Sequence, residues 1–83
     1  MTIEQQKLDA LVADLAKDLE SAVASIEAET LPTTQNRYGR YLNLILTVSK
    51  GDKAVAAVIR LALLKAGANP QGVAGAFHGL FGR

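Results

Sequence analysis

The sequence predicts an all-α protein, a small helical bundle made of one long N-terminal helix and three shorter helices. Three observations lead to this class: apolar residues recur at helical spacing, capping residues with glycine and proline punctuate the helical segments, and no two segments pair convincingly as strands. We expect a single domain over residues 1–83, with helices at about 3–28, 34–49, 53–66 and 70–81.

The first helix is expected to begin at Ile3, because Thr2 and Gln5 have the spacing of a capping box. Glycine and proline are absent before Pro32, so the helix can continue to about Ala28, a length of roughly 39 Å at 1.5 Å per residue. Its apolar residues step by 4 and 3 in a heptad pattern. The candidate self-association seam comprises Leu8, Val12, Leu15, Leu19 and Ile26, with Ala22 in the same row and Leu11 and Val23 beside it. So long a helix either lies across several shorter ones or pairs with its copy in a second subunit.

The second helix is expected to be apolar around most of its circumference. Pro32 ends the first helix, because proline restricts the residue before it and cannot donate to the helical hydrogen-bond ladder. The polar residues that follow form only a narrow stripe, which comprises Asn36, Arg40, Asn43, Thr47 and Lys50. Residues 41–48 also have high β propensity, so a strand is the alternative here, although no other segment offers a convincing partner strand.

The third and fourth helices are delimited by their capping residues. Gly51 is suited to end the second helix and Asp52 to cap the third, which is so rich in Ala, Val, Ile and Leu that we expect it to be central and buried. Asn69 followed by Pro70 starts the fourth helix. Its glycines weaken it by up to about 1 kcal/mol each, so it should form only when docked, and we expect it to dock onto the third helix.

Composition favours self-association. A chain of 83 residues is near the size at which folded monomers become marginally stable, and it has no cysteine for disulfides and only one histidine. With glycine included, about 57% of the residues are apolar, above the roughly 45–50% of average soluble domains. Since oligomerisation is the remaining common means of reinforcement, we expect a homodimer to complete the bundle.

Charge is distributed unevenly along the chain. Residues 1–36 carry two basic and seven acidic side chains, a net −5, whereas residues 37–83 carry seven basic and one acidic, a net +6. The stretch RYGRY at residues 37–41 could contact phosphates and stack on bases. On a helix, however, its tyrosines lie on the apolar face, and its arginines would lie near Glu27 and Glu29 of an antiparallel first helix. We therefore favour packing.

The basic C-terminal half still defines a candidate interaction surface, which comprises Arg37, Arg40, Lys50, Lys53, Arg60 and Lys65. If it binds nucleic acid, the third helix would have to read base edges, yet it offers mostly apolar side chains there. These residues could therefore contact phosphates but would not recognise bases.

The sequence gives no indication of catalysis. We expect no catalytic, cofactor-binding or metal-binding residues, because no phosphate loop, metal-ligand spacing or nucleophile motif occurs. His78, the only side chain that titrates near neutral pH, is expected to be satisfied or solvent-facing, and its role is open. With no membrane span or leader pattern, we expect a cytoplasmic protein, with membrane contact by the C-terminal segment as a minor alternative.

These observations predict a non-enzymatic module for protein–protein interaction, assembly or regulation, which forms a homodimer and recognises a protein partner that the sequence does not identify. The alternative is a nucleic-acid-binding regulator that uses the basic C-terminal half.

Overall fold

The computed structural model describes residues 2–29 and 34–82, with the backbone alone described at residues 34–37. It contains four α-helices: α1 (Ile3–Ala28), α2 (Thr34–Ser49), α3 (Lys53–Lys65) and α4 (Pro70–Phe81). The predicted all-α class, with one long helix followed by three shorter ones, is confirmed. Residues 41–48 are helical, so the strand alternative for this segment is wrong, and the described part of the chain contains no strand.

Side-chain caps explain where three of the helices begin. Thr2 and Gln5 form the expected capping box at α1, Asp52 accepts a hydrogen bond from the Val55 backbone N–H at 3.0 Å, and Asn69 caps α4. Lys50 and Gly51 have positive φ values of 54° and 84°, a backbone conformation that suits glycine. This left-handed pair turns the chain sharply from α2 into α3.

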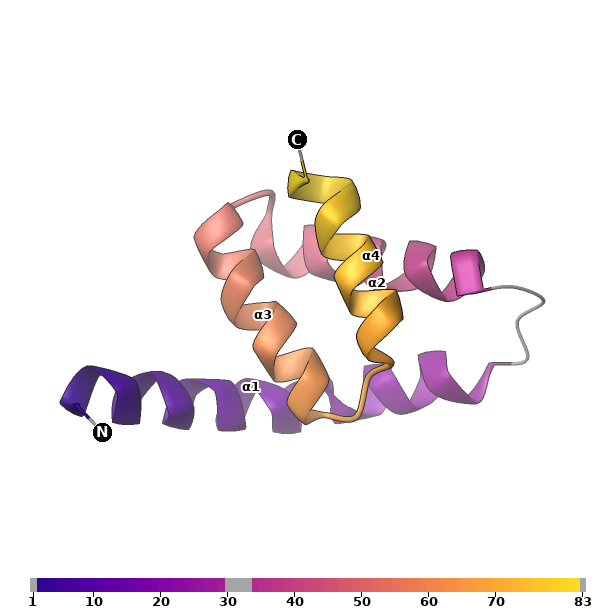
Figure 1. The fold of residues 1–83 in the computed structure, drawn as a ribbon. Helices are drawn as coiled ribbons and strands as arrows, with labels where there is room; N and C mark the ends of the chain where they lie inside the picture. Colours follow the sequence, from indigo (N-terminus) through magenta and orange to yellow (C-terminus); the bar gives the residue numbers. More distant parts are fainter. Residues whose placement is uncertain (1, 30–33, 83) are drawn as a thin grey trace.

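The helices lie as two antiparallel pairs whose contacts are mainly between the pairs. In Figure 1, α1 and α2 run in opposite directions, and the α3–α4 pair crosses them, with α3 packed mainly on α1 and α4 mainly on α2. Their shared core contains side chains from α2, α3 and α4 that are almost completely excluded from solvent. The largest of these are Tyr41, Ile45, Ile59, Leu63 and Val73.

The glycine-bearing side of α4 lies against α2, which corrects the expectation that α4 would dock mainly onto the third helix. A Cβ atom at Gly75 would lie 3.0 Å from Cδ2 of Tyr38, and one at Gly79 would collide with the Tyr38 hydroxyl. The aromatic ring therefore occupies the space that the missing side chains leave. The glycines weaken α4 as a helix but permit its close approach to α2.

The N-terminal part of α1 extends beyond the bundle. Every residue from 3 to 11, a segment that we name the overhang, is exposed, and its large apolar side chains Ile3, Leu8 and Leu11 are 67, 40 and 50% exposed. From Val12 to Ile26, by contrast, α1 buries one face. Figure 1 shows the overhang projecting past α3 at the indigo end of the chain.

The overhang gives the molecule an elongated form of 43 × 29 × 20 Å. The chain exposes 5379 Å², whereas surface scaling for a globular monomer of 8.8 kDa gives about 4,800 Å². An excess of about 600 Å² is thus left uncovered relative to an average monomer. In the described ranges, none of the helices combines the length and the apolar composition needed to cross a membrane.

Candidate functional site

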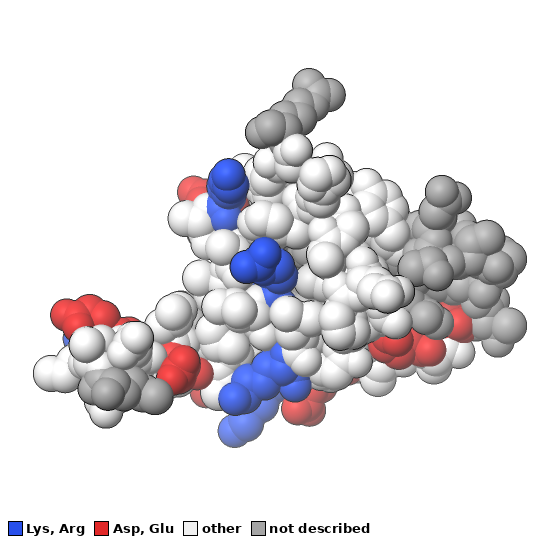
Figure 2. All heavy atoms as spheres, viewed as in Figure 1, with Lys and Arg blue, Asp and Glu red and all other residues white. Residues whose placement is uncertain are grey.

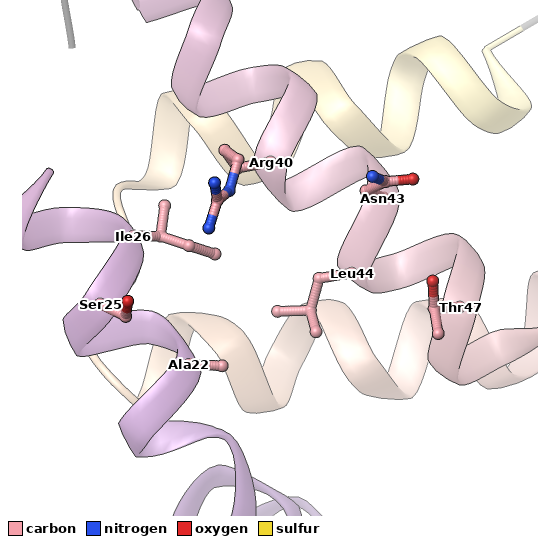
Figure 3. A pocket seen from close by; sticks show the side chains of 7 residues that line it. All are labelled: Ala22, Ser25, Ile26, Arg40, Asn43, Leu44 and Thr47. Carbon is pink, nitrogen blue, oxygen red and sulfur yellow. The ribbon is translucent and has the colours of Figure 1, made fainter.

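A groove of about 390 Å³ separates α1 from α2. Figure 3 shows its two walls, with Ala22 of α1 and Leu44 of α2 pointing toward one another across the opening. The lining is apolar in its middle and polar along its edges. It comprises Ala22, Ser25, Ile26, Arg40, Asn43, Leu44 and Thr47. Such a mixed surface suits a protein segment that has one apolar face and polar flanks.

One end of the groove carries an ion pair. Nη2 of Arg40 lies 2.8 Å from Oε1 of Glu29, and the two side chains are 53% and 28% exposed. This contact confirms the expected approach of Glu29 to Arg40. Exposed pairs of this kind contribute about 0–1 kcal/mol, so its main effect is to hold the Arg40 guanidinium beside the groove.

The half-buried carboxylate of Glu27 links three parts of the fold near that end. It accepts a hydrogen bond from the Tyr41 hydroxyl of α2 and another, at 3.1 Å, from the backbone N–H of Asn69. Sequence reasoning expected Glu27 near the arginines and missed these two bonds. No local pattern could have indicated the second, because its partners lie 42 residues apart.

The candidate self-association seam divides into two parts. Val12, Leu19 and Ile26 are buried within their own chain, whereas Leu15 is half-buried and Leu8 is exposed. The buried members pack into the core and are not available to a second copy while the chain stays folded. The exposed part of the seam is therefore its N-terminal end.

A second row of residues lies beside the seam, on the side of α1 that faces the groove. At 100° per residue, its members fall within about 100° of one another around the helix. We name this the lateral row, and it comprises Leu8, Leu11, Leu15, Ala22 and Ser25. It runs from the exposed overhang to the wall of the groove, with the exposed Asp18 in the same arc between Leu15 and Ala22. Its large side chains lie in the N-terminal half and its small ones in the C-terminal half.

The predicted basic surface is not gathered into one patch among the described side chains. Lys50 and Lys53 lie at the α2–α3 turn and Lys65 at the other end of α3, about 18 Å away at 1.5 Å per residue. Arg40 pairs with Glu29, and the side chain of Arg37 lies outside the described residues. In Figure 2 the Lys and Arg atoms occupy separate places with uncharged atoms between them.

Arg60 contributes to packing between α3 and α4. Its guanidinium lies 4.7 Å from the ring centroid of Phe77, which in turn packs against Phe81 with centroids 5.1 Å apart. A cation over an aromatic face contributes about 0.5–1 kcal/mol at an exposed site. This predicted surface residue therefore has a structural contact in the same chain.

The remaining titratable candidates are solvent-facing. His78 is exposed in the last turn of α4, and Asp14 and Asp18 are exposed on α1. Within residues 2–29 and 34–82, no cluster of three or more histidine, cysteine or acidic side chains could hold a metal ion.

Comparison with known proteins found no similar protein: no protein-family model, no curated protein and no solved structure matches this chain at a significant level.

Proposed function

We propose that this protein is a non-enzymatic interaction module that self-associates into a homodimer and serves as a small assembly or regulatory adaptor. The observation that carries the proposal is the overhang, on which Leu8 and Leu11 remain exposed beyond the reach of α3. Apolar side chains grouped on an uncovered helix face are typical of protein-binding surfaces.

The exposed apolar side chains of the overhang support this proposal, since Ile3, Leu8 and Leu11 are 67, 40 and 50% exposed. Further apolar side chains remain exposed on α3, so a dimer formed through α1 would keep a second surface for a different protein. They are Val55, Leu61 and Leu64.

The nucleic-acid alternative has less support. Arg40 and Arg60 already have partners in the chain, and the lysines of the candidate surface are spread over both ends of α3. The proposed location is the cytoplasm, which agrees with a chain that contains no cysteine for disulfides.

Sedimentation equilibrium at micromolar protein concentration tests the proposal. A dimer has twice the 8.8 kDa of the chain, and substitution of Glu for Leu11 should shift the protein toward the single-chain mass. Leu61→Glu is the matched control, because Leu61 is similarly exposed but lies on α3. A wild-type protein that sediments at 8.8 kDa throughout this range would contradict the proposal.

A gel-shift titration distinguishes the interaction module from the alternative, a nucleic-acid-binding protein. The interaction module should not retard DNA or RNA at low salt, whereas a nucleic-acid binder would do so and would lose affinity steeply as salt rises.

A further inference from the structure

We propose that the outer face of α3 binds an acidic amphipathic helix of a partner protein. This inference rests on the proposed adaptor role and names the class of partner, which docks on a surface separate from the overhang. The site is a strip of apolar side chains with basic side chains along both of its edges.

The apolar part of the site lies on the side of α3 that faces solvent. At 100° per residue, four apolar residues fall within about 80° of one another around the helix, and the residues of α3 that are buried in the core lie on the opposite side. Leu61 and Leu64 are 41 and 39% exposed, so their own chain leaves them partly uncovered. We name this surface the α3 strip, and it comprises Ala54, Ala57, Leu61 and Leu64.

Basic residues border the α3 strip on both sides, and α3 contains no acidic residue. Lys53 and Arg60 lie within about 40° of Leu64 on one edge. Lys65 lies about 40° from Leu61 on the other edge. Both lysines are exposed and Arg60 is half-buried. Figure 2 shows Lys and Arg atoms spaced along the region of α3, with uncharged atoms between them.

This pattern is complementary to a helix that has an apolar stripe between two rows of carboxylates. Apolar residues spaced three and four apart on such a helix would pack along the α3 strip, as helices dock on apolar faces. Ala54 and Ala57 leave room for large apolar side chains of the partner in the N-terminal half of the strip. Carboxylates beside them would pair with the basic edges, which contributes to specificity and association rate more than to affinity.

The overhang of a second copy fits this site poorly. Glu4 lies between Leu8 and Leu11 around α1, so a carboxylate interrupts the apolar face of the overhang instead of flanking it. Lys7 lies about 40° from Leu11 and would meet a basic edge of the α3 strip. The partner is therefore a different protein, whose acidic residues lie beside its apolar stripe.

The length of the α3 strip limits the strength of the interaction. From Ala54 to Leu64 the strip spans about 15 Å, nearly three turns of helix. An interface of this length is at the small end of protein–protein contacts, so binding is weak and transient. Because the basic side chains lie at its solvent-facing edges, the affinity falls as salt rises.

Fluorescence anisotropy with labelled synthetic peptides tests the inference on the full chain. The acidic peptide is a helix with leucines three and four residues apart and glutamates along both sides of this stripe. The control peptide has lysines in place of the glutamates. We expect the acidic peptide to bind roughly tenfold more tightly than the basic one, with a difference that shrinks in high salt.

Two pairs of variants locate the site, with circular dichroism to verify that each is folded. Leu61→Gln should weaken binding of the acidic peptide by roughly tenfold, whereas Leu46→Gln, at a similarly exposed position on α2, should leave it unchanged. Lys53→Glu should weaken binding by roughly threefold to tenfold, whereas Lys7→Glu makes the same change of charge on α1 and should have little effect.

Equal binding of the two peptides, or equal losses within either pair of variants, would overturn the inference. Sedimentation separates it from self-association. A wild-type dimer that does not bind the acidic peptide refutes this site alone, whereas a wild-type monomer that binds the peptide refutes only the self-association.

Vesicles of phosphatidylcholine, with and without phosphatidylserine, test the other anionic surface that basic and apolar side chains could meet. The wild-type protein should cosediment with neither. Selective binding to the vesicles with phosphatidylserine, without binding of the acidic peptide, would assign the α3 strip to a membrane surface and contradict the inference.

Discussion

The clearest prediction compares two leucines on α3 whose burial differs. Leu63 is 0% exposed and Leu61 is 41% exposed, although they lie two residues apart on one helix. Each Leu→Ala change removes three carbon-sized groups at about 0.8 kcal/mol each, or about 2.4 kcal/mol for a fully buried side chain. A residual cavity raises the expected loss at Leu63 to about 3–4 kcal/mol, whereas partial exposure limits the loss at Leu61 to about 1.4 kcal/mol.

Urea denaturation followed by circular dichroism at 222 nm measures both losses. A chain of 83 residues should have a total unfolding free energy of about 4–12 kcal/mol, so Leu63→Ala should remove between about a quarter and nearly all of it. All variants are compared at one protein concentration and again after tenfold dilution, since dimerisation couples stability to concentration.

A difference of about 2 kcal/mol between the two substitutions is the expected result. Equal losses would refute the reasoning, because they would mean that the two faces of α3 are equally buried and that α3 does not pack as described.

The remaining predictions concern helix contacts, a buried hydroxyl and a cap. Gly39→Ala should raise the free energy of unfolding by about 0.5–1 kcal/mol, because no other atom lies near a Cβ at this position. The free energy of unfolding of Gly79→Ala should be at least about 1 kcal/mol lower than that of Gly39→Ala, because its Cβ would collide with Tyr38. Urea midpoints measure both, and equal gains would contradict the packing of α4 on α2. Tyr41→Phe should cost about 1.5–3 kcal/mol in the same titration, since it removes a hydrogen bond to a carboxylate on α1, and a change below 0.5 kcal/mol would show that this bond contributes little. Asp52→Ala should cost about 1 kcal/mol, seen as a fall of roughly 4–8 °C in Tm, whereas Asp52→Asn should retain most of the cap.

Helix positions were predictable because the signals that set them are local. Thr2, Asp52 and Asn69 each bond backbone N–H groups within three residues, so the sequence contains both partners of each cap. The tyrosines at 38 and 41 were also expected on the packed face. Tyr41 is buried, and Tyr38 is half-buried against α4.

The interaction surfaces were less predictable, because they depend on where one helix crosses another. The heptad pattern of α1 is the same from Leu8 to Ile26, and nothing in it marks the point at which α3 ceases to cover the helix. Only the structure shows that coverage begins near Val12. The contact of Gly75 and Gly79 with Tyr38 was equally unpredictable, since Tyr38 lies 37 and 41 residues away from them in the chain.

The bond between Glu27 and the backbone of Asn69 bears on the order of folding events. It joins positions 42 residues apart, and closing so large a chain loop costs about 3.3 kcal/mol of entropy plus a constant. The hydrogen bond from Tyr41 to the same carboxylate closes a loop of only 14 residues, at an entropy cost of about 2.3 kcal/mol plus the same constant. The contact between α1 and α2 at Glu27 should therefore form before the bond that ties α1 to the corner between α3 and α4.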